Sequence, residues 1–292
     1  MKRLLLLLLP LLLAGCGSAP EQPSKPVDEP LKLDTEAGRT AYDLEHPEEA
    51  AEKYRAALER AQARDDLEQI GTLGYDLAVA ELQANAPDRA LSAARTTRTE
   101  LERRGAKPFP ALTLVEATAL YRTGATAEAD AAAARAEGAG DAEASARATF
   151  LRGLIADERG DEAALTGAAE KLRGADKPAL QADRAELAAR VALRRGDAKL
   201  ASQEATRAEA LRRETLDYRG LARVLAVGAE AAKRAGDRKS AADLFWRAGR
   251  SAAAQGDVKI ARLWLRQAAS LAPDQPVGNA AKDLLAKLDR GQ

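Results

Sequence analysis

Residues with catalytic or metal-binding chemistry are scarce in this sequence and lie far apart. Its 292 residues include one histidine, His46, and one cysteine, Cys16. A zinc site needs three or four His, Cys or carboxylate ligands, and a nucleophile activated by histidine would have to use His46. Because His46 directly precedes Pro47, which can open a helix, we expect it to be structural. We therefore expect no catalytic residue, no metal site and no cofactor.

Carboxylate pairs are the remaining candidates for catalysis, since two of them can hydrolyse a glycosidic bond. The 45 acidic residues balance 45 basic ones, and no acidic pair stands in an apolar, glycine-rich or aromatic setting. A nucleic-acid-binding protein would need an excess of basic residues or aromatic side chains on which bases can stack. The charges of this chain balance and its aromatic residues are only 3%, so we do not expect it to bind nucleic acid. A glycan-binding module, for which only Trp246 and Trp264 are available, and a glycan-processing enzyme are kept as alternatives to an interaction protein.

Arg-Gly-Asp occurs twice, at 159–161 and 195–197. It could be a displayed adhesion motif or a joint between two helices. Gly-Asp also occurs without the arginine at 236–237 and 256–257. Glycine ends a helix easily because it adopts positive φ, and aspartate caps the next helix by accepting from a free N–H. We therefore interpret these pairs as helix joints.

The first 15 residues have the layout of a secretory signal. Lys2 and Arg3 precede an apolar run from Leu4 to Ala14, which is shorter than the roughly 20 residues that span a membrane. The ending Leu13-Ala14-Gly15-Cys16 resembles the bacterial lipobox. That resemblance implies cleavage before Cys16 and lipidation of Cys16, so the mature protein would be held in a membrane by its acyl chains.

A proline-rich segment follows the cysteine, with prolines at 20, 23, 26 and 30. This spacing favours extended polyproline II, so residues 16–33 are expected to form the lipidated cysteine and a tether. In bacterial lipoproteins the residues after the cysteine steer sorting. By that resemblance, Gly17 and Ser18 fit the outer membrane, with the protein on its periplasmic face; in a single-membraned cell the anchor would sit on the outer face of the plasma membrane.

Residues 34–290 predict an all-α domain. The segment is rich in Ala, Leu, Arg and Glu, and Gly124, Gly160, Gly196 and Gly236 mark breaks spaced by 36 to 40 residues. A fixed period of this size is typical of a helical solenoid. The break at 104–110 is the longest and the best candidate hinge. We expect seven hairpins, pairing helices 34–44 with 47–64, 67–84 with 87–104, 109–123 with 126–138, 141–159 with 161–173, 177–195 with 197–214, 216–235 with 237–255, and 257–271 with 277–289.

The repeats resemble the tetratricopeptide family. The best match lies in residues 245–273, where Ala248-Gly249 precede Gly256-Asp257 and Ala261-x₃-Leu265-x₂-Ala268, and Pro273 follows. Near the start, Gly38 precedes Ala50-x₃-Tyr54-x₂-Ala57. Elsewhere the match is reduced to small residues where helices cross, and Sel1-like arrays match less well. The resemblance implies a TPR-like α-solenoid that acts as a non-enzymatic protein-protein interaction scaffold.

Such lipoproteins work in outer-membrane, pilus, peptidoglycan or polysaccharide-export assembly, so we expect protein partners in the cell envelope and no nucleic acid. In the family the first helix of each hairpin lines a concave groove. Counting from the joints, the resemblance places these side chains in it: Tyr42, Tyr75, Leu82, Leu114, Tyr121, Phe150, Leu154, Glu186, Arg190, Arg194, Glu230, Lys233 and Arg234. The wall would be apolar in its first half and charged in its second.

Overall fold

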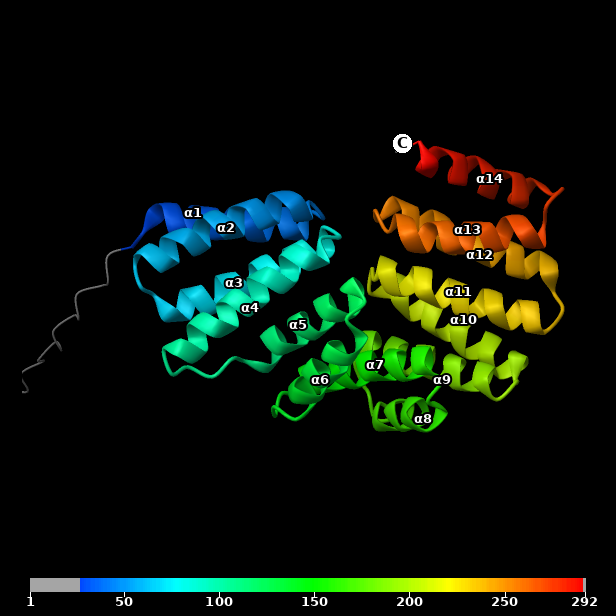
Figure 1. Cartoon of the computed structure of the whole chain (residues 1–292), viewed down its shortest axis with the longest axis horizontal. Helices are drawn as coiled ribbons and strands as arrows, with labels where there is room; N and C mark the ends of the chain where they lie inside the picture. The colour runs from blue at the N-terminus through cyan, green and yellow to red at the C-terminus, as the bar shows by residue number, and fades with distance from the viewer. Residues whose placement is uncertain (1–26, 291–292) are drawn as a thin grey trace, which may run out of the picture.

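The computed structural model describes residues 27–290, and this part of the chain consists of fourteen α-helices without a strand. Each helix packs against the next, giving seven consecutive hairpins as predicted. The hairpins follow an arc, with α1–α4 on one side, α10–α14 on the other and α5–α9 between them (Figure 1). Cys16, the signal segment and most of the tether lie outside the described residues.

The helices are short, and most are connected by two to four residues. Their bounds are α1 Glu29–Asp43, α2 Pro47–Ala63, α3 Leu67–Gln83, α4 Pro87–Arg103, α5 Pro110–Thr123, α6 Thr126–Glu137, α7 Ala142–Arg159, α8 Glu162–Lys171, α9 Pro178–Arg194, α10 Ala198–Glu214, α11 Tyr218–Arg234, α12 Arg238–Ala254, α13 Val258–Leu271 and α14 Pro276–Asp289.

The Gly-Asp pairs are helix joints, as the sequence predicted. Gly160 and Gly196 have φ of 75° and 78°, which is the left-handed region that glycine reaches without strain. Asp161 then accepts from the N–H of Ala164, and Asp197 accepts from that of Leu200, each at 2.9 Å. The pairs at 236–237 and 256–257 are built in the same way.

Other joints reach the same backbone shape without glycine. Glu45, Asp65, Asn85 and Leu216 have φ between 54° and 60°. A side chain costs about 1–2 kcal/mol in this region, least for Asn and Asp. Leu216 is the most strained of these residue types, and its side chain is 62% exposed. The joint there is therefore held by the packing of the helices on either side.

Helix α1 begins five residues earlier than the expected start at 34. Asp28 caps it by accepting from the N–H of Leu31 at 3.0 Å, and Pro30 stands in the first turn, where its missing N–H costs nothing. Asp28 also accepts from Arg60 of α2. Pro30 therefore belongs to the helical domain and not to the tether.

Small residues fill the crossings between helices. Gly153 of α7 shows why: a Cβ added there would lie 2.7 Å from Leu187 Cδ1 on α9. Gly38 lies under the ring of Tyr54 in the same way. The alanines expected at crossings are all fully buried: Ala117, Ala129, Ala136, Ala189, Ala201, Ala208, Ala229, Ala241 and Ala248. These residues let neighbouring helices approach closely along the whole arc.

The break at 104–110 is tied to the helices beside it. Phe109 meets the ring of Tyr75 on α3 edge to face, with the ring centres 5.5 Å apart. Both rings join the cluster of Leu101 and Leu112. The longest break of the first half therefore carries part of its core.

The arc closes on itself at one place, which we call the seam. It joins the α3–α4 joint (84–86) to the α12–α13 joint (255–257). Asn85 donates its side-chain N–H to the carbonyl oxygen of Gly256 at 2.6 Å, although the two residues are 171 positions apart. Arg219 of α11 reaches the carbonyl oxygens of Gln83 and Gln255, both at 3.4 Å. The seam therefore bounds the inner groove of the arc on one side.

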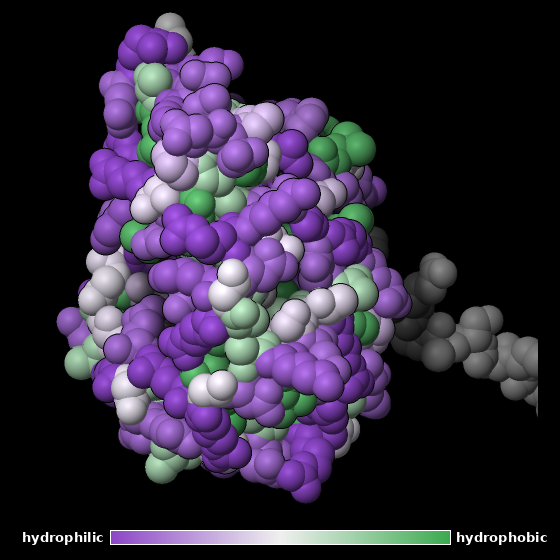
Figure 2. Space-filling model, turned by 90° about the vertical axis from the view of Figure 1, so that its right-hand side faces the viewer, coloured by the Kyte–Doolittle hydropathy of each residue, from purple (hydrophilic) through white to green (hydrophobic). Residues whose placement is uncertain are grey.

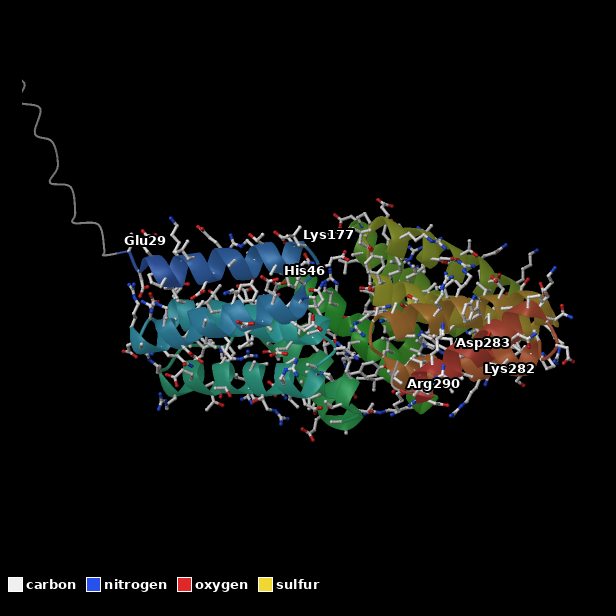
Figure 3. The ribbon with its side chains drawn as sticks, turned by 90° about the horizontal axis from the view of Figure 1, so that it is seen from above. Glu29, His46, Lys177, Lys282, Asp283 and Arg290 are labelled. Atoms are coloured by element: carbon white, nitrogen blue, oxygen red, sulfur yellow. The ribbon has the colours of Figure 1, made fainter. Side chains whose placement is uncertain are left out.

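One face of the molecule, shown in Figure 2, is mainly polar, with small separated apolar spots. His46 lies exposed at the joint between α1 and α2, where its Nδ1 is 3.5 Å from Glu49 Oε2 (Figure 3). No described helix is both long enough and apolar enough to cross a membrane.

Candidate functional site: a cavity inside the arc

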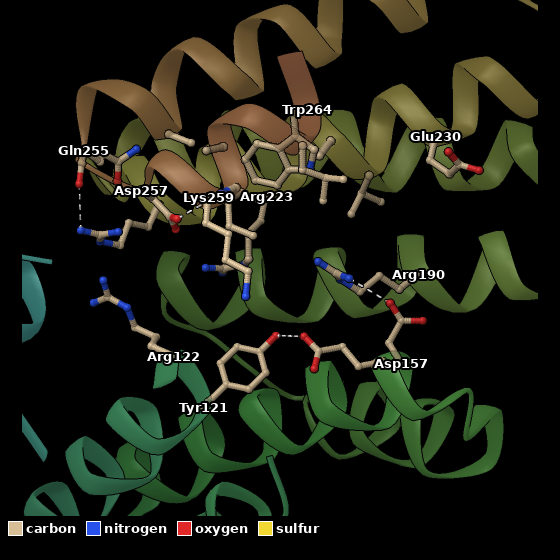
Figure 4. A pocket seen from close by; sticks show the side chains of 18 of the residues that line it. Tyr121, Arg122, Asp157, Arg190, Arg223, Glu230, Gln255, Asp257, Lys259 and Trp264 are labelled. Carbon is tan, nitrogen blue, oxygen red and sulfur yellow. Dashed lines mark hydrogen bonds and ion pairs between the residues drawn. The ribbon is translucent and has the colours of Figure 1, made fainter. Parts of the chain in front are cut away.

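A cavity of about 850 Å³ lies on the inner side of the arc, next to the seam. The first helices of five successive hairpins, α5, α7, α9, α11 and α13, contribute side chains to it, and the α3–α4 joint closes one side. Figure 4 shows Tyr121 and Asp157 on one wall and Lys259 and Trp264 on the other. The odd-numbered helices therefore form the inner wall, as the family resemblance implied.

The apolar part of the cavity comes from the C-terminal half. Trp264, Ile260 and Leu263 of α13 face it together with Val227 of α11 and Phe245 of α12. Trp264 and Ile260 pack partly against the hydrophobic cluster of the last hairpins, while Leu263 stays 53% exposed. This wall can bury an apolar side chain of a ligand.

Most charged groups of the cavity neutralise one another. Asp157 accepts from Arg190 at 2.9 Å and from Arg194 at 2.8 Å. Arg234 donates to Glu230 at 3.2 Å. These acids and arginines are paired already, so they give the cavity polarity more than net charge.

A buried carboxylate underneath the cavity, that of Glu186, neutralises Arg223, which is the fourth paired arginine of the lining. Glu186 of α9 is fully buried and accepts from Arg190, Arg212 and Arg223 at 3.0 to 3.2 Å. Burial alone would raise the pKa of Glu186, but the charges of Arg223, Arg190 and Arg212 hold that pKa well below its ordinary value. Arg212 is also held by Asp183 at 2.6 Å. The network fixes α9, α10 and α11 to one another.

Tyr121 links α5 to α7 within one wall of the cavity (Figure 4). Its hydroxyl donates to the carboxylate of Glu158 on α7. Burial, and then this bond, raise the pKa of Tyr121 well above its ordinary value. Tyr121 is therefore a neutral donor whose hydroxyl is already in use.

Three cations of the cavity have no carboxylate partner among residues 27–290. Arg122 of α5 donates to the carbonyl oxygen of Leu82 and to the side-chain oxygen of Asn85, and Arg219 reaches only carbonyl oxygens at the seam. The ammonium of Lys259 makes no hydrogen bond or ion pair within this range. Burial, and then the charge of Arg219, lower the pKa of Arg122 to about 10. Burial also lowers the pKa of Arg219.

The structure brings five of the residues predicted for the groove into this cavity. They are Tyr121, Arg190, Arg194, Glu230 and Arg234. Lys233 is exposed outside the lining and pairs with Glu230. The charged second half of the expected groove therefore lies largely within the cavity.

Apart from Tyr121, the apolar first half of the expected groove does not gather in the cavity. Leu154 is 3% exposed and belongs to the interior because neighbouring helices cover it, and Glu186, from the charged half, is also fully buried. Phe150 is half-buried under the guanidinium groups of Arg212 and Arg223, at 5.4 and 5.5 Å from its ring centre. Four others are half-buried against local hydrophobic clusters, namely Tyr42, Tyr75, Leu82 and Leu114.

Sequence reasoning did not single out the seam cations. Arg122 stands in the last turn of α5, where a basic residue complements the helix dipole, so its position carries no special signal. Arg219 and Lys259 each fall in the first turn of a helix, where a cation is less favourable. Lys199 and Arg238 share that placement outside the cavity, so it does not single out the seam cations.

Comparison with solved structures places this architecture among known folds. A tetratricopeptide repeat protein from Parabacteroides merdae is similar with a TM-score of 0.50 and 16% identity, over 88% of this chain and 98% of that one. The fold is a tetratricopeptide-like α-solenoid. The apo form of the quorum sensor NprR from B. thuringiensis is similar with a TM-score of 0.53 and 14% identity, over 90% of this chain and 71% of that one. No protein-family model and no curated protein matches the chain in sequence.

Proposed function

We propose that this protein is a non-enzymatic interaction scaffold that binds a segment of another protein in the cavity. The observation that supports this most is the cavity itself, because five hairpins contribute one continuous inner wall to it. Solenoids use such concave walls to bind extended segments or helices of their partners. The scaffold function rests on the residues of this wall and not on any catalytic group.

The proposal includes a place in the cell. Cys16 would carry lipid and anchor the protein to the periplasmic face of the outer membrane, or to the outer face of the plasma membrane in a single-membraned cell. The partner would then be an envelope protein, in outer-membrane, pilus, peptidoglycan or polysaccharide-export assembly. The lipobox-like ending and the lone cysteine support this part of the proposal.

Site-specific photo-crosslinking in intact cells tests the scaffold proposal. A photoreactive amino acid replaces Leu263, which is 53% exposed and lines the cavity, or Leu200, which is 43% exposed on α10 and does not line it. We expect a discrete adduct with another protein from position 263 and none from position 200. No adduct from 263, or equal adducts from both positions, would contradict the proposal.

A further inference from the structure

The unpaired cations at the seam indicate what kind of segment the cavity takes. Seven basic and four acidic side chains line it, which leaves three more positive charges than negative ones. The paired arginines described above leave Arg122, Arg219 and Lys259 without an ion pair among the described residues. The nearby acid whose charge acts on both of these arginines is Asp257, which caps α13. Figure 4 shows Arg122 and Lys259 entering the cavity from opposite walls.

Like charges held together in a half-buried place are costly unless an anion joins them. Arg122 and Arg219 come from α5 and α11, and both are held toward the seam by carbonyl oxygens. A carboxylate placed between them could accept from both guanidinium groups and from the ammonium of Lys259. Such charge-assisted hydrogen bonds are about twice as strong as neutral ones.

We propose that the cavity binds an acidic polypeptide segment whose carboxylate lies between Arg122, Arg219 and Lys259 while a neighbouring apolar side chain packs against Trp264. This inference rests on the proposed scaffold function and names the chemistry of the partner. The apolar wall of α13 stands directly beside the cations, because Lys259 and Trp264 lie on the same helix. One short stretch of an extended chain can therefore contact both.

The acids of the lining favour such a segment over a polyanion. Asp157, Glu158, Glu230 and Asp257 share the cavity with the cations. A phosphate chain or a sulfated glycan carries charge along its whole length and would meet these carboxylates. A polypeptide with one or two acidic residues next to apolar ones would not.

Fluorescence anisotropy with a defined probe tests the inference. The probe is a fluorescein-labelled, amidated octapeptide in which two glutamates alternate with two leucines between glycines. The matched control peptide carries glutamine in place of each glutamate. We expect the purified protein to bind the glutamate peptide about tenfold more tightly than the glutamine peptide, which is the contribution expected of ion-paired hydrogen bonds. That preference should shrink as salt is added.

Two variants and one control link the preference to the seam. Arg122→Gln with Arg219→Gln should bring the two peptides within about threefold of each other, the loss expected for charge-assisted bonds. Lys259→Gln should lower the affinity for the glutamate peptide severalfold without disturbing the fold, because the ammonium of Lys259 makes no hydrogen bond or ion pair with another described residue. The control is Arg238→Gln, since Arg238 also donates only to a helix-end carbonyl, that of Leu271, but lies outside the cavity.

Several results would overturn the inference. They are equal affinity for both peptides, no binding of either, an unchanged Lys259→Gln variant, or stronger competition by a sulfated oligosaccharide than by the glutamate peptide. If a cross-link still forms from position 263 in cells, the scaffold proposal survives and only the acidic character of the partner is wrong. If no cross-link forms either, both proposals fail.

Discussion

Replacing Glu186 by glutamine should destabilise the middle of the solenoid strongly. Glutamine keeps the shape of the side chain and removes its charge, so Arg223 loses the one carboxylate it contacts within the described chain. Arg190 keeps Asp157, and Arg212 keeps Asp183. Breaking a buried ion pair costs about 3–5 kcal/mol, and we expect about 3 kcal/mol here because Arg223 is partly exposed.

The assay is urea unfolding followed by circular dichroism, together with amide hydrogen exchange resolved to α9 and α11. Exchange is needed because a repeat array can open locally. The second variant is Glu186→Gln with Arg223→Gln, which leaves every remaining charge of the network paired and should recover at least about 1 kcal/mol by removing the unpaired ion. A Glu186→Gln variant that loses less than about 1 kcal/mol, or a double variant no more stable than Glu186→Gln alone, would refute the reasoning.

The pH dependence of this effect has a definite sign. The pKa of Glu186 is lowered in the folded protein, so its contribution is present above its ordinary pKa of 4.5 and is lost as the pH falls toward the lower, folded value. The variant does not titrate at this position. The gap in unfolding free energy between wild type and Glu186→Gln should therefore narrow as the pH falls below 4.5. A gap that widens in acid would contradict the assignment.

Three further outcomes follow from features already described. Asp161→Ala should cost about 0.5–2 kcal/mol as the lost cap of α8, whereas Arg159→Ala should cost less than about 1 kcal/mol, because its ion pair with Asp130 is exposed, and should not change cell adhesion; urea midpoints and a binding assay on host cells check both. Leu216→Gly should raise the free energy of unfolding by about 1 kcal/mol by relieving its positive φ, while Leu44→Gly, equally exposed but at φ −87°, should not; equal effects would rule out backbone strain. Cys16→Ser should abolish fatty-acid labelling, and an unlabelled wild-type protein would end the lipoprotein proposal.

The hairpins and the Gly-Asp joints could be predicted because their causes are local. A glycine that accepts positive φ and an aspartate that caps the next turn act within a few residues. Breaks near Asp65 and Leu216 were predicted as well, but the positive φ of these two residues could not be predicted from residue type. There the packing of neighbouring helices imposes a backbone shape that the side chain itself disfavours.

The cavity was only half predictable for a different reason. Counting positions along each hairpin places Tyr121, Arg190, Arg194 and Arg234 on the inner wall, since that register repeats. Which parts of the wall face one another depends on small rotations summed over many repeats. No local pattern carries that sum, so the meeting of Asn85 with the α12–α13 joint appears only in the folded chain.

The seam also gives this solenoid an unusual mechanical character. A superhelix whose turns touch only their neighbours stretches like a spring, because small rotations between repeats add up. The bond from Asn85 to Gly256 clips two distant points of the coil together. A force that pulls the two ends apart would act first on the contact between Asn85 and Gly256. The solenoid should therefore resist extension until this contact breaks and extend easily afterwards. If the protein is tethered at one end and bound to a partner at the other, this contact would set the force above which the solenoid lengthens.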